Sequence, residues 1–494
     1  MMKRICVLSS SYAESISDTA EYDDYICTPA HYFDANDPNY QFELVQLHKA
    51  TSYRVVRSLV HSGKYDCFFN LCDGGKDEDR AGEEVVRALE EFEVPFTGAD
   101  SAHFDPSKPE MKMIGYFAGI NVPMHVVLQE VPTLSELRNF LEGFTFPLIV
   151  KHPHACASSG MTKRSKCNTY EEVIEQVSIF IKRIKVAMIE EFIVGDEVTV
   201  LAVQTPNGTK VLPPAQMNFP DGEEFKHFDL KWITYEGLEW FQVPENDPHY
   251  KEMMRVGEVS FETMLGGVGY GRCDLRIQRE TGKVYFLEIN PNCGILYPPG
   301  SESSADWILK FDKTFGHKDF VISLIEGAMQ EHRRTKKIFK VNFTSKKGYH
   351  CITARDIAKD EIIFEDECQP TNIVTRPYVM QHWSPQPIKD FEAYAWPLSN
   401  DSHVYATWSE DHKKWRSINH SCDPNCGFCK NNSLNCRALR DIPAGEEITM
   451  DYATFYDEAM SMFDCHCDAP NCRSQIHVND PTMKATGEFA WHRS

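Results

Sequence analysis

Residues 271–292 form the stretch GRCDLRIQRETGKVYFLEINPN, which decides the fold of the region around it. Polar and apolar residues alternate on both sides of residues 279–283, which predicts a β-hairpin with its turn there. With the pairing centred on Thr281, one face carries two opposed polar pairs: Asp274 with Glu288, and Arg272 with Asn290. The other face carries the apolar set Leu275, Ile277, Tyr285, Leu287 and Ile289.

The polar face of this hairpin predicts a magnesium site. Directly opposed side chains lie roughly 5 Å apart at Cβ, and like charges that close repel one another unless a cation lies between them. Carboxylate and amide oxygens suit Mg²⁺, which takes the rest of its shell from waters and substrate phosphates. The alternative is a hairpin whose ordinary polar residues face solvent.

Length and composition are those of an intracellular globular protein. The 494 residues suggest about three domains. No apolar run reaches the length of a membrane span, and the apolar run of the first residues is too short for a secretory signal. Seventeen cysteines then favour a reducing compartment, cytoplasmic or nuclear, with thiols in cores or on metal. The net charge of −22 disfavours direct binding of nucleic acid and favours a basic partner such as a protein tail.

The first 105 residues predict an open α/β domain, because apolar strands alternate with an amphipathic helix. The strands are expected at residues 4–8, 65–72 and 94–98, and the helix carries a stripe of Val85, Val86, Leu89 and Phe92. The glycines after the second strand do not complete a phosphate-loop motif, so we interpret them as scaffold.

Candidate phosphate-binding residues follow from Lys108 onward. Lys108 and Lys112 lie four residues apart on a predicted helix, and Lys151 ends an apolar strand at residues 146–151. A small-residue segment at 155–160, which includes Ser158, offers backbone N–H groups to phosphate. A second apolar strand, 186–189, leads to carboxylates suited to a nucleoside, Glu190 and Glu197.

The order of these features resembles the ATP-grasp superfamily, most closely its D-alanine–D-alanine ligase branch, over residues 1–330. The resemblance implies that Lys112 (or Lys108) and Lys151 grip the nucleotide, that backbone groups near Glu190 contact adenine, and that Glu197 holds the ribose. It also implies a phosphate-side lysine, Lys231. The family motifs G-x-G-R-x-D and L-E-x-N are met by residues 269–274 and 287–290. They imply Mg²⁺ ligands at Asp274, Glu288 and Asn290, and an arginine, Arg272, that stabilises an acyl-phosphate oxyanion.

The implied chemistry is ATP-dependent amide formation from a small-molecule carboxylate and an amine. Such a reaction depends on charge neutralisation around the transferring phosphoryl group. Two segments depart from the family pattern: residues 9–15 replace its paired glycines, and residues 291–297 replace its serine-bearing loop. We therefore expect a carboxylate–amine ligase without assigning D-alanyl-D-alanine as its product.

The segment after residue 338 is different in composition, and seven of the seventeen cysteines fall between residues 422 and 472. Cys465, Cys467 and Cys472 form C-x-C-x4-C, and Cys422 supplies a fourth thiolate. Four thiolates make a closed tetrahedral Zn²⁺ site. A second metal at Cys426, Cys429 and Cys436 is a weaker alternative.

Residues 419–425, N-H-S-C-D-P-N, and the segment around Tyr452 resemble SET-domain methyltransferases with a post-SET zinc loop. The resemblance implies that Asn419 and His420 bind S-adenosylmethionine, and that Tyr452 is the active-site tyrosine. The glycine motif that opens the family appears as residues 346–349, so Gly348 and Tyr349 are further cofactor-binding candidates.

We therefore expect an α/β and α+β ATP-grasp ligase fold followed by a mostly-β SET domain with a zinc-bound post-SET loop. The expected parts are residues 1–105, 106–330, a linker at 331–337, 338–462, a zinc loop at 463–476 and a tail at 477–494. The favoured function is a bifunctional enzyme that uses ATP, Mg²⁺, S-adenosylmethionine and Zn²⁺, with protein lysine as the usual methyl acceptor. In the alternatives only one half is catalytic, and the other senses nucleotide or binds a basic peptide. The ligase relatives are commonly dimers, so a homodimer is a further expectation.

Overall fold

The computed structural model describes residues 2–13, 15–16, 25–76, 78–154, 160–233, 237–335, 338–345, 347–364, 372–397, 403–407, 418–429, 432–454 and 462–477. The chain divides into two compact units, Met1–Thr335 and Lys336–Ser494, which are described separately. Among the described residues, no helix combines the length and the apolar composition needed to cross a membrane.

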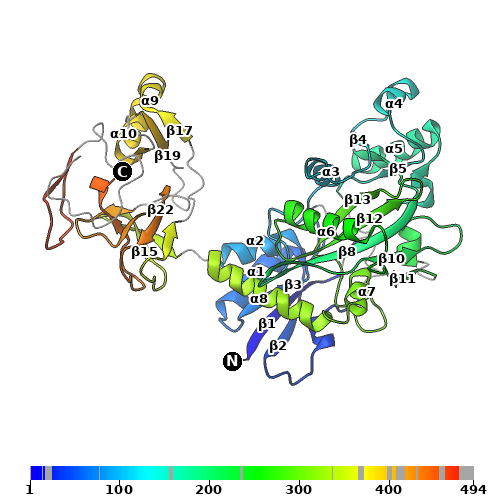
Figure 1. Ribbon diagram of the computed structural model, residues 1–494, viewed down its shortest axis with the longest axis horizontal. Helices are drawn as coiled ribbons and strands as arrows, with labels where there is room; N and C mark the ends of the chain where they lie inside the picture. The colour runs from blue at the N-terminus through cyan, green and yellow to red at the C-terminus, as the bar shows by residue number, and fades with distance from the viewer. Residues whose placement is uncertain are drawn as a thin grey trace. The chain divides into compact units, whose positions relative to one another are not determined.

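A three-stranded parallel sheet in the order β2-β1-β3 begins the first unit (Figure 1). Its elements are β1 (Lys3–Ser10), β2 (Tyr40–Leu47), α1 (Ser52–His61), β3 (Cys67–Asn70) and α2 (Glu83–Glu91). The central strand β1 is apolar and fully buried from Ile5 to Leu8, because both of its faces are covered there. The predicted α/β arrangement is confirmed, with two differences. Strand β2 was not predicted, and residues 94–98 contribute one bridge, between Phe68 and Phe96, in place of a strand.

A four-stranded antiparallel sheet follows, in the order β4-β7-β5-β6. Its region contains α3 (Lys108–Phe117), β4 (His125–Leu128), α4 (Leu134–Phe140), β5 (Leu148–Lys151), β6 (Lys166–Cys167), α5 (Tyr170–Ile184) and β7 (Ala187–Glu191). Helices α4 and α5 each begin with a capping box, at Thr133 and Thr169, which satisfies backbone N–H groups of the first turn. Strand β5 is buried at all four positions, so Lys151 enters the interior at its end.

A larger sheet in the order β11-β10-β8-β12-β13, with β9 paired to β8, completes the first unit. Its elements are β8 (Gly195–Thr205), β9 (Gly208–Val211), β10 (Ala215–Asn218), β11 (Glu239–Gln242), α6 (Tyr250–Met264), β12 (Tyr270–Gln278), β13 (Val284–Pro291), α7 (Ser304–Phe311) and α8 (His317–Thr335). Alternate residues of β8 face two separate cores: Val200 packs with α6, and Leu201 packs with α7 and α8. Figure 1 shows α6 and α8 over opposite faces of this sheet.

The β12–β13 hairpin has the predicted register at its polar end. Arg272 pairs with Asn290, and Asp274 pairs with Glu288. A bulge then follows Asp274, so that Leu275 pairs with Phe286.

This bulge makes the predicted apolar face wrong in its second half. An extra residue in one strand reverses the faces beyond it. Phe286 and Val284 are therefore buried with Leu275, while Tyr285 and Leu287 are only partly buried.

The second unit consists mostly of short strands, as predicted. Its elements are β14 (Phe339–Thr344), β15 (Gly348–Thr353), β16 (Ile362–Phe364), β17 (Asn372–Thr375), α9 (Arg376–His382), α10 (Pro385–Tyr394), β18 (Trp396–Pro397), β19 (Val404–Thr407), β20 (Asn419–His420), β21 (Cys426–Cys429), β22 (Asn432–Ala438), β23 (Thr449–Met450), β24 (Phe463–Asp464) and β25 (Gln475–Ile476). The main sheet has the order β16-β22-β21-β23-β20. Cys351, Phe428, Cys436 and Ile448 are fully buried in its core. Ile357 forms an isolated bridge to Ile442.

Candidate functional site

The four polar residues of the hairpin converge on one face of the large sheet. Arg272 donates from Nε and Nη2 to the two oxygens of Asp274, each at 2.9 Å. Asn290 Nδ2 donates to Asp274 Oδ2 at 3.0 Å. Nζ of Lys108, on α3, lies 2.8 Å from Oε2 of Glu288. Side chains two residues apart on a strand share a face, which is why the alternating sequence produces this cluster.

Glu288 is held in its ionised form by this cluster. Burial raises the pKa of the carboxyl, but the charges of Lys108 and Lys151 outweigh burial and lower it to about 2. Burial alone would lower the pKa of the Arg272 guanidinium. The neighbouring carboxylate of Asp274 outweighs burial and raises this pKa above its ordinary value. The cluster therefore combines ionised oxygen donors with a fixed guanidinium, as a site for metal and phosphate requires.

Glu190 lies between two of the predicted nucleotide-gripping lysines. Lys112 Nζ is 2.8 Å from its Oε2, and Lys151 Nζ is 2.9 Å from its Oε1. All three side chains are buried. Burial lowers the pKa of Lys112 to about 8, and Glu190 opposes that shift. Lys112 also donates to the Leu287 carbonyl at the hairpin bulge, at 3.0 Å, which connects α3, β5, β7 and β13.

Glu197, the predicted ribose ligand, lies near the start of β8 and is mostly buried. Its Oε2 is 3.5 Å from Nη2 of Arg276. Arg276 also donates to the Ile193 carbonyl at 2.9 Å and lies 4.4 Å from the centre of the Phe192 ring. Arg276 was not singled out from the sequence, although it lies on the same strand, two residues after Asp274.

Two lysines, Lys226 and Lys231, lie in the segment that leads to β11. Lys231 was predicted to contact phosphate. Lys231 lies in a π-helical turn, Asp229–Ile233, with Nζ 5.1 Å from the centre of the Trp232 ring. Lys226, which was not singled out from the sequence, has its Nζ 4.6 Å from the centre of the Trp240 ring. Burial lowers its pKa, while the charges of Glu197, Asp274 and Glu288 act in the opposite direction. No spacing rule distinguishes the two lysines. Ser158, the remaining phosphate candidate, lies outside the described residues.

The end of the hairpin is anchored to the first sheet by Asn292. Its Oδ1 accepts from the Ala99 N–H at 3.0 Å, and its Nδ2 donates to the Cys72 carbonyl at 3.3 Å. Gly269, just before β12, packs there too. A Cβ on this residue would lie 2.3 Å from the carbonyl carbon of Gly98, and its φ is +71°. Only glycine fits this approach.

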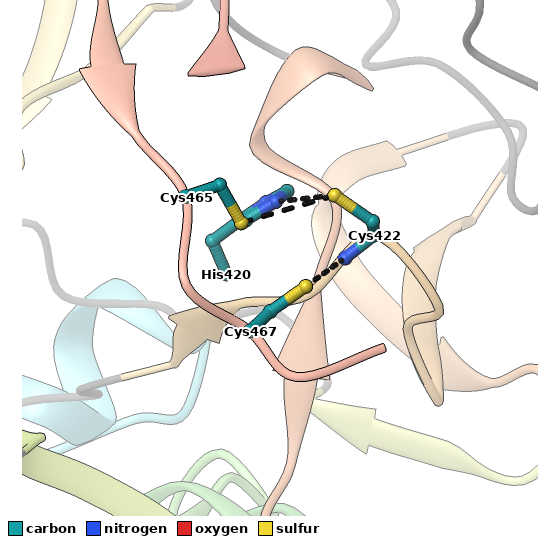
Figure 2. Close-up of side chains that lie close together, drawn as sticks. All are labelled: His420, Cys422, Cys465 and Cys467. Atoms are coloured by element: carbon teal, nitrogen blue, oxygen red, sulfur yellow. Dashed lines mark hydrogen bonds between the residues drawn. The ribbon is translucent and has the colours of Figure 1, made fainter. Parts of the chain in front are cut away.

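A cysteine and histidine cluster occupies the second unit (Figure 2). Atoms of His420, Cys422, Cys465 and Cys467 that are able to bind a metal all lie within 4.8 Å of one another. The sulfurs of Cys422 and Cys465 are 3.8 Å apart, about the edge of a tetrahedron with Zn–S bonds of ~2.3 Å. Burial raises the pKa of Cys467, but backbone N–H groups and neighbouring thiols lower it to about 7, which favours the thiolate that zinc binds.

Cys472, the fourth predicted ligand, lies next to this group of four but outside it. It packs with Cys422 and Cys465, and its Sγ is 3.5 Å from the Cys465 carbonyl oxygen. His420 lies inside the group, with Nε2 3.3 Å from Cys422 Sγ. Within the described ranges, Cys426, Cys429 and Cys436 do not form a metal-binding cluster. Cys426 and Cys436 are instead buried in the core.

The predicted methyl-donor residues lie around the parallel pair β20 and β23. His420 Nδ1 accepts from the Tyr452 N–H at 3.1 Å, and the two rings are 5.4 Å apart. The Tyr452 hydroxyl donates to the Ile418 carbonyl at 2.6 Å. Asn419 Nδ2 donates to Glu447 Oε1 at 3.1 Å and to the Lys347 carbonyl at 3.4 Å.

Asn419 is therefore close to Gly348, the residue after Lys347. Gly348 has φ +67°, and the Tyr349 ring lies 5.0 Å from that of Phe343. The segments that carry the candidates thus adjoin one another.

Two family models match the chain. Residues 116–297 match "D-ala D-ala ligase C-terminus", and residues 348–453 match "SET domain". The first interval contains the hairpin, Lys151 and Glu190, and the second contains Asn419 and Tyr452.

Curated relatives and solved structures resemble the first unit. A D-alanine–D-alanine ligase of Herminiimonas arsenicoxydans is 24% identical over 272 residues, which are 54% of this chain and 77% of the relative. A second, of Pseudomonas fluorescens, is 28% identical over 237 residues, 47% of this chain and 68% of the relative. The VanG D-Ala:D-Ser ligase of Enterococcus faecalis aligns with a TM-score of 0.50 at 17% identity, over 66% of this chain and all of that structure. Together with the family matches, these findings confirm the predicted ATP-grasp and SET folds.

Proposed function

This chain joins an ATP-grasp region of the D-alanine–D-alanine ligase type to a SET domain, and we propose that both halves are catalytic. The first forms an amide from a small-molecule carboxylate and an amine with ATP. The second transfers a methyl group from S-adenosylmethionine to an amine. The observation that carries the ligase half is the convergence of Arg272, Asp274, Glu288 and Asn290 on one face of the hairpin.

The ligase reaction proceeds in two steps, phosphorylation of the carboxylate and displacement of phosphate by the amine. A carboxylate oxygen attacks the γ-phosphorus of ATP, the bond from that phosphorus to the β,γ-bridging oxygen breaks, and ADP leaves. The amine then attacks the acyl carbon, the bond to the phosphate oxygen breaks, and phosphate leaves as the nitrogen loses a proton. Both steps gather negative charge, so catalysis depends on fixed positive groups.

Asp274, Glu288 and Asn290 fit Mg²⁺, because they lie on one face of the hairpin as opposed or diagonal neighbours and Glu288 is held ionised. When bound, Mg²⁺ neutralises phosphate charge. Arg272 is oriented by Asp274 and by Ser304, whose Oγ accepts from its Nη1 at 3.1 Å. A guanidinium fixed on two sides presents its remaining donors without further reorganisation, and we assign it to the acyl oxygen.

Lys112 and Lys151 are assigned to the nucleotide phosphates, and the buried carboxylate of Glu190 keeps both ammonium groups in place. Backbone groups near Glu190 would contact adenine, and Glu197 would hold the ribose. For the phosphate-side lysine, the charges around Lys226 favour it over Lys231. The assignment of Ser158 remains a prediction from the sequence.

The ligase half is tested by ADP release from Mg²⁺ and ATP with a panel of carboxylates and amines. Glu288→Gln should reduce turnover by at least about 100-fold, because it removes an ionised metal ligand. Glu280→Gln, in the exposed turn of the same hairpin, is the matched control and should retain activity. Equal turnover of wild type and Glu288→Gln would refute the assignment of the hairpin.

The methyltransferase half is supported by the proximity of Asn419, His420 and Tyr452. We assign Asn419, His420, Gly348 and Tyr349 to S-adenosylmethionine, which supplies the methyl group when bound. The Tyr452 hydroxyl is fixed by the Ile418 carbonyl. Its oxygen can therefore accept a hydrogen bond from the amine that attacks the methyl carbon, which orients that amine. Basic protein tails are the acceptors that the net charge of −22 favours.

Methyl transfer is tested with labelled cofactor and basic peptides. Tyr452→Phe should lower the rate by about 100-fold while the affinity for cofactor stays within about twofold, because the hydroxyl acts on the amine. Tyr378→Phe, on the exposed side of α9, controls for loss of a tyrosine hydroxyl. Failure of the wild type to bind cofactor in calorimetry would refute this half of the proposal.

We assign Zn²⁺ to Cys422, Cys465, Cys467 and Cys472, with His420 as the alternative fourth ligand. Zinc would fix the segment after β24 against β20, next to Tyr452. None of the fifteen cysteines in the described ranges forms a disulfide, which supports a reducing intracellular location.

A further inference from the structure

Arg276, on β12, is a buried arginine to which the proposed ligase chemistry assigns no task. Strand β12 lies beside β8 (Figure 1), and the register places Arg276 directly opposite Glu197. Directly opposed side chains lie on the same face of a sheet. The register with β8 is unbroken, so Arg272, Asp274 and Arg276 also share one face. Arg276 therefore lies on the face that carries the metal and phosphate cluster.

The guanidinium of Arg276 joins three separate segments. Its Nη1 donates to the Ile193 carbonyl at 2.9 Å, in the linker between β7 and β8. Its Nη2 donates to the Glu224 carbonyl and lies 3.5 Å from Oε2 of Glu197. Its Cζ lies over the Phe192 ring, 4.4 Å from the ring centre. One side chain thus holds together the linker, the start of β8 and the segment that leads to β11.

The linker held by Arg276 lies between the two carboxylates assigned to the nucleoside. Glu190 belongs to β7, Glu197 belongs to β8, and residues 192–194 join the two strands. Backbone groups near Glu190 are assigned to adenine, and the Glu197 carboxylate is assigned to the ribose. Hydrogen bonds between two oxygens require a separation of about 2.5–3.0 Å. The hold on Glu197 therefore decides whether its carboxylate meets a ribose hydroxyl.

The position of Arg276 is more costly than packing alone requires. Its side chain is 3% exposed, and its Nε has no hydrogen-bond partner among the described residues. Burial lowers the pKa of the guanidinium, and Glu197 is the largest opposing charge. A buried charge with incomplete partners is destabilising, whereas a methionine would fill much of the same space without a charge. The arginine is therefore expected to serve the site and not the core.

A guanidinium is better suited to such a task than an ammonium. Its donors lie in one plane at fixed angles, so two carbonyls bonded to Nη1 and Nη2 fix its orientation. The fixed group then presents its positive charge at a constant place beside Glu197. A carboxylate held in this way is ordered before a nucleotide arrives, and less ordering is left to oppose binding.

We propose that Arg276 is a positioning residue for the nucleoside: it holds Glu197 where its carboxylate accepts a hydrogen bond from a ribose hydroxyl. It acts through its contacts with the Ile193 and Glu224 carbonyls and does not touch the nucleotide itself. This inference rests on the proposed ligase function. It makes Arg276 responsible, through Glu197, for the selection of ribonucleotides over deoxynucleotides.

Calorimetric titration of the full chain with Mg²⁺ and ATP, 2′-deoxyATP or 3′-deoxyATP tests this role. The wild type should bind at least one deoxynucleotide about 10- to 100-fold more weakly than ATP, because a hydroxyl bonded to a carboxylate is missing. Arg276→Met should bring the two affinities to within about threefold of each other, because Glu197 is no longer held in place. Arg279→Met, in the exposed turn of the same hairpin, is the matched control and should keep the wild-type ratio.

A purely structural role for Arg276 gives a different result. In that case Arg276→Met binds ATP and both deoxynucleotides more weakly by the same factor, and the ratio of the wild type is kept. That result would assign the arginine to the fold alone and would overturn the inference.

Glu197→Gln separates this inference from the function beneath it. Loss of the ratio in Glu197→Gln but not in Arg276→Met would overturn the role of Arg276 and leave the ribose assignment intact. A ratio that Glu197→Gln keeps, or equal affinities in the wild type, would contradict the ribose assignment and the inference with it. Absence of ATP binding by the wild type would contradict the ligase half itself.

Arg276→Lys keeps the test decisive where Arg276→Met fails to fold. Lysine retains a cation beside Glu197 but lacks the planar fork that holds the Ile193 and Glu224 carbonyls. We expect Arg276→Lys to reduce the ratio by at least about threefold. A ratio equal to that of the wild type would overturn the inference, because it would show that the two carbonyl contacts are not needed.

Discussion

Lys108 Nζ lies 2.8 Å from Glu288 Oε2, so a helix lysine neutralises a carboxylate that we assign to Mg²⁺. The pair joins the first turn of α3 to β13. It explains how two carboxylates on opposed strands are tolerated, because each has its own cation: Lys108 for Glu288 and Arg272 for Asp274.

Glu288 should make the first unit sensitive to acid in magnesium-free buffer. Its pKa in the folded chain is about 2, below the ordinary value of about 4.5. A lowered pKa contributes stability that is present above pH 4.5 and is lost as pH falls toward 2, an effect of at most about 3 kcal/mol. Urea unfolding across this range should give a flatter pH profile for Glu288→Gln than for wild type. Glu280→Gln should keep the wild-type profile; identical profiles for all three would contradict the pairing.

The two lysines of the segment that leads to β11 should differ in their effect on ADP release. Lys226→Met should lower kcat by about 100-fold, because an ammonium near the carboxylates faces the phosphates. Both ammonium groups lie near a tryptophan ring, Lys226 at 4.6 Å from Trp240 and Lys231 at 5.1 Å from Trp232. Since the charges of the site's carboxylates act on Lys226, Lys231→Met should be the milder change and should alter kcat by less than about threefold. The reverse order of effects would restore Lys231 as the phosphate ligand.

Chelation of zinc should loosen residues 462–476 and leave nucleotide binding unchanged. A closed zinc site contributes directly to folding of the loop around it. Hydrogen exchange of this segment should therefore rise on chelation and in Cys422→Ser, while ATP affinity stays the same. Bound zinc per chain in Cys472→Ser and in His420→Ala then identifies the fourth ligand. Wild-type zinc content in Cys422→Ser would contradict the site.

The hairpin bulge predicts that alanine substitutions at two neighbouring positions lower the free energy of unfolding by very different amounts. Phe286 is fully buried against Leu275, so Phe286→Ala should lower the free energy of unfolding by about 3–5 kcal/mol. Tyr285→Ala should cost about 1 kcal/mol or less, because Tyr285 is only partly buried. Urea midpoints of the two variants measure the difference. A larger loss for Tyr285→Ala would restore the uninterrupted register.

The polar end of the hairpin was predictable because the alternation is strict there. Arg272, Asp274, Glu288 and Asn290 are polar residues separated by apolar ones, so the register followed from the position of the turn. Beyond them, residues 284–287 are four apolar residues in a row. Such a run does not indicate which side chains face the core. The position of the bulge depends on packing against α6.

Contacts between distant segments were beyond a sequence pattern. The lysines that hold Glu190 lie 78 and 39 residues before it, and no local periodicity encodes that distance. Our proposal of Lys226 over Lys231 likewise depends on the fold around the segment and not on spacing. His420 differs, since it lies two residues before Cys422 and alternate residues of an extended segment share a side. Its proximity to the cysteines was therefore accessible from spacing.

Asn292 uses both ends of its amide to hold the first sheet, through Ala99 and Cys72, while Asn290, two residues earlier, belongs to the metal cluster. One short piece of backbone thus joins the first sheet to the residues that we assign to phosphoryl transfer. A substitution that released Asn292 would therefore also misalign Asn290 and Asp274. Its effect would appear in turnover as much as in the stability of the first sheet.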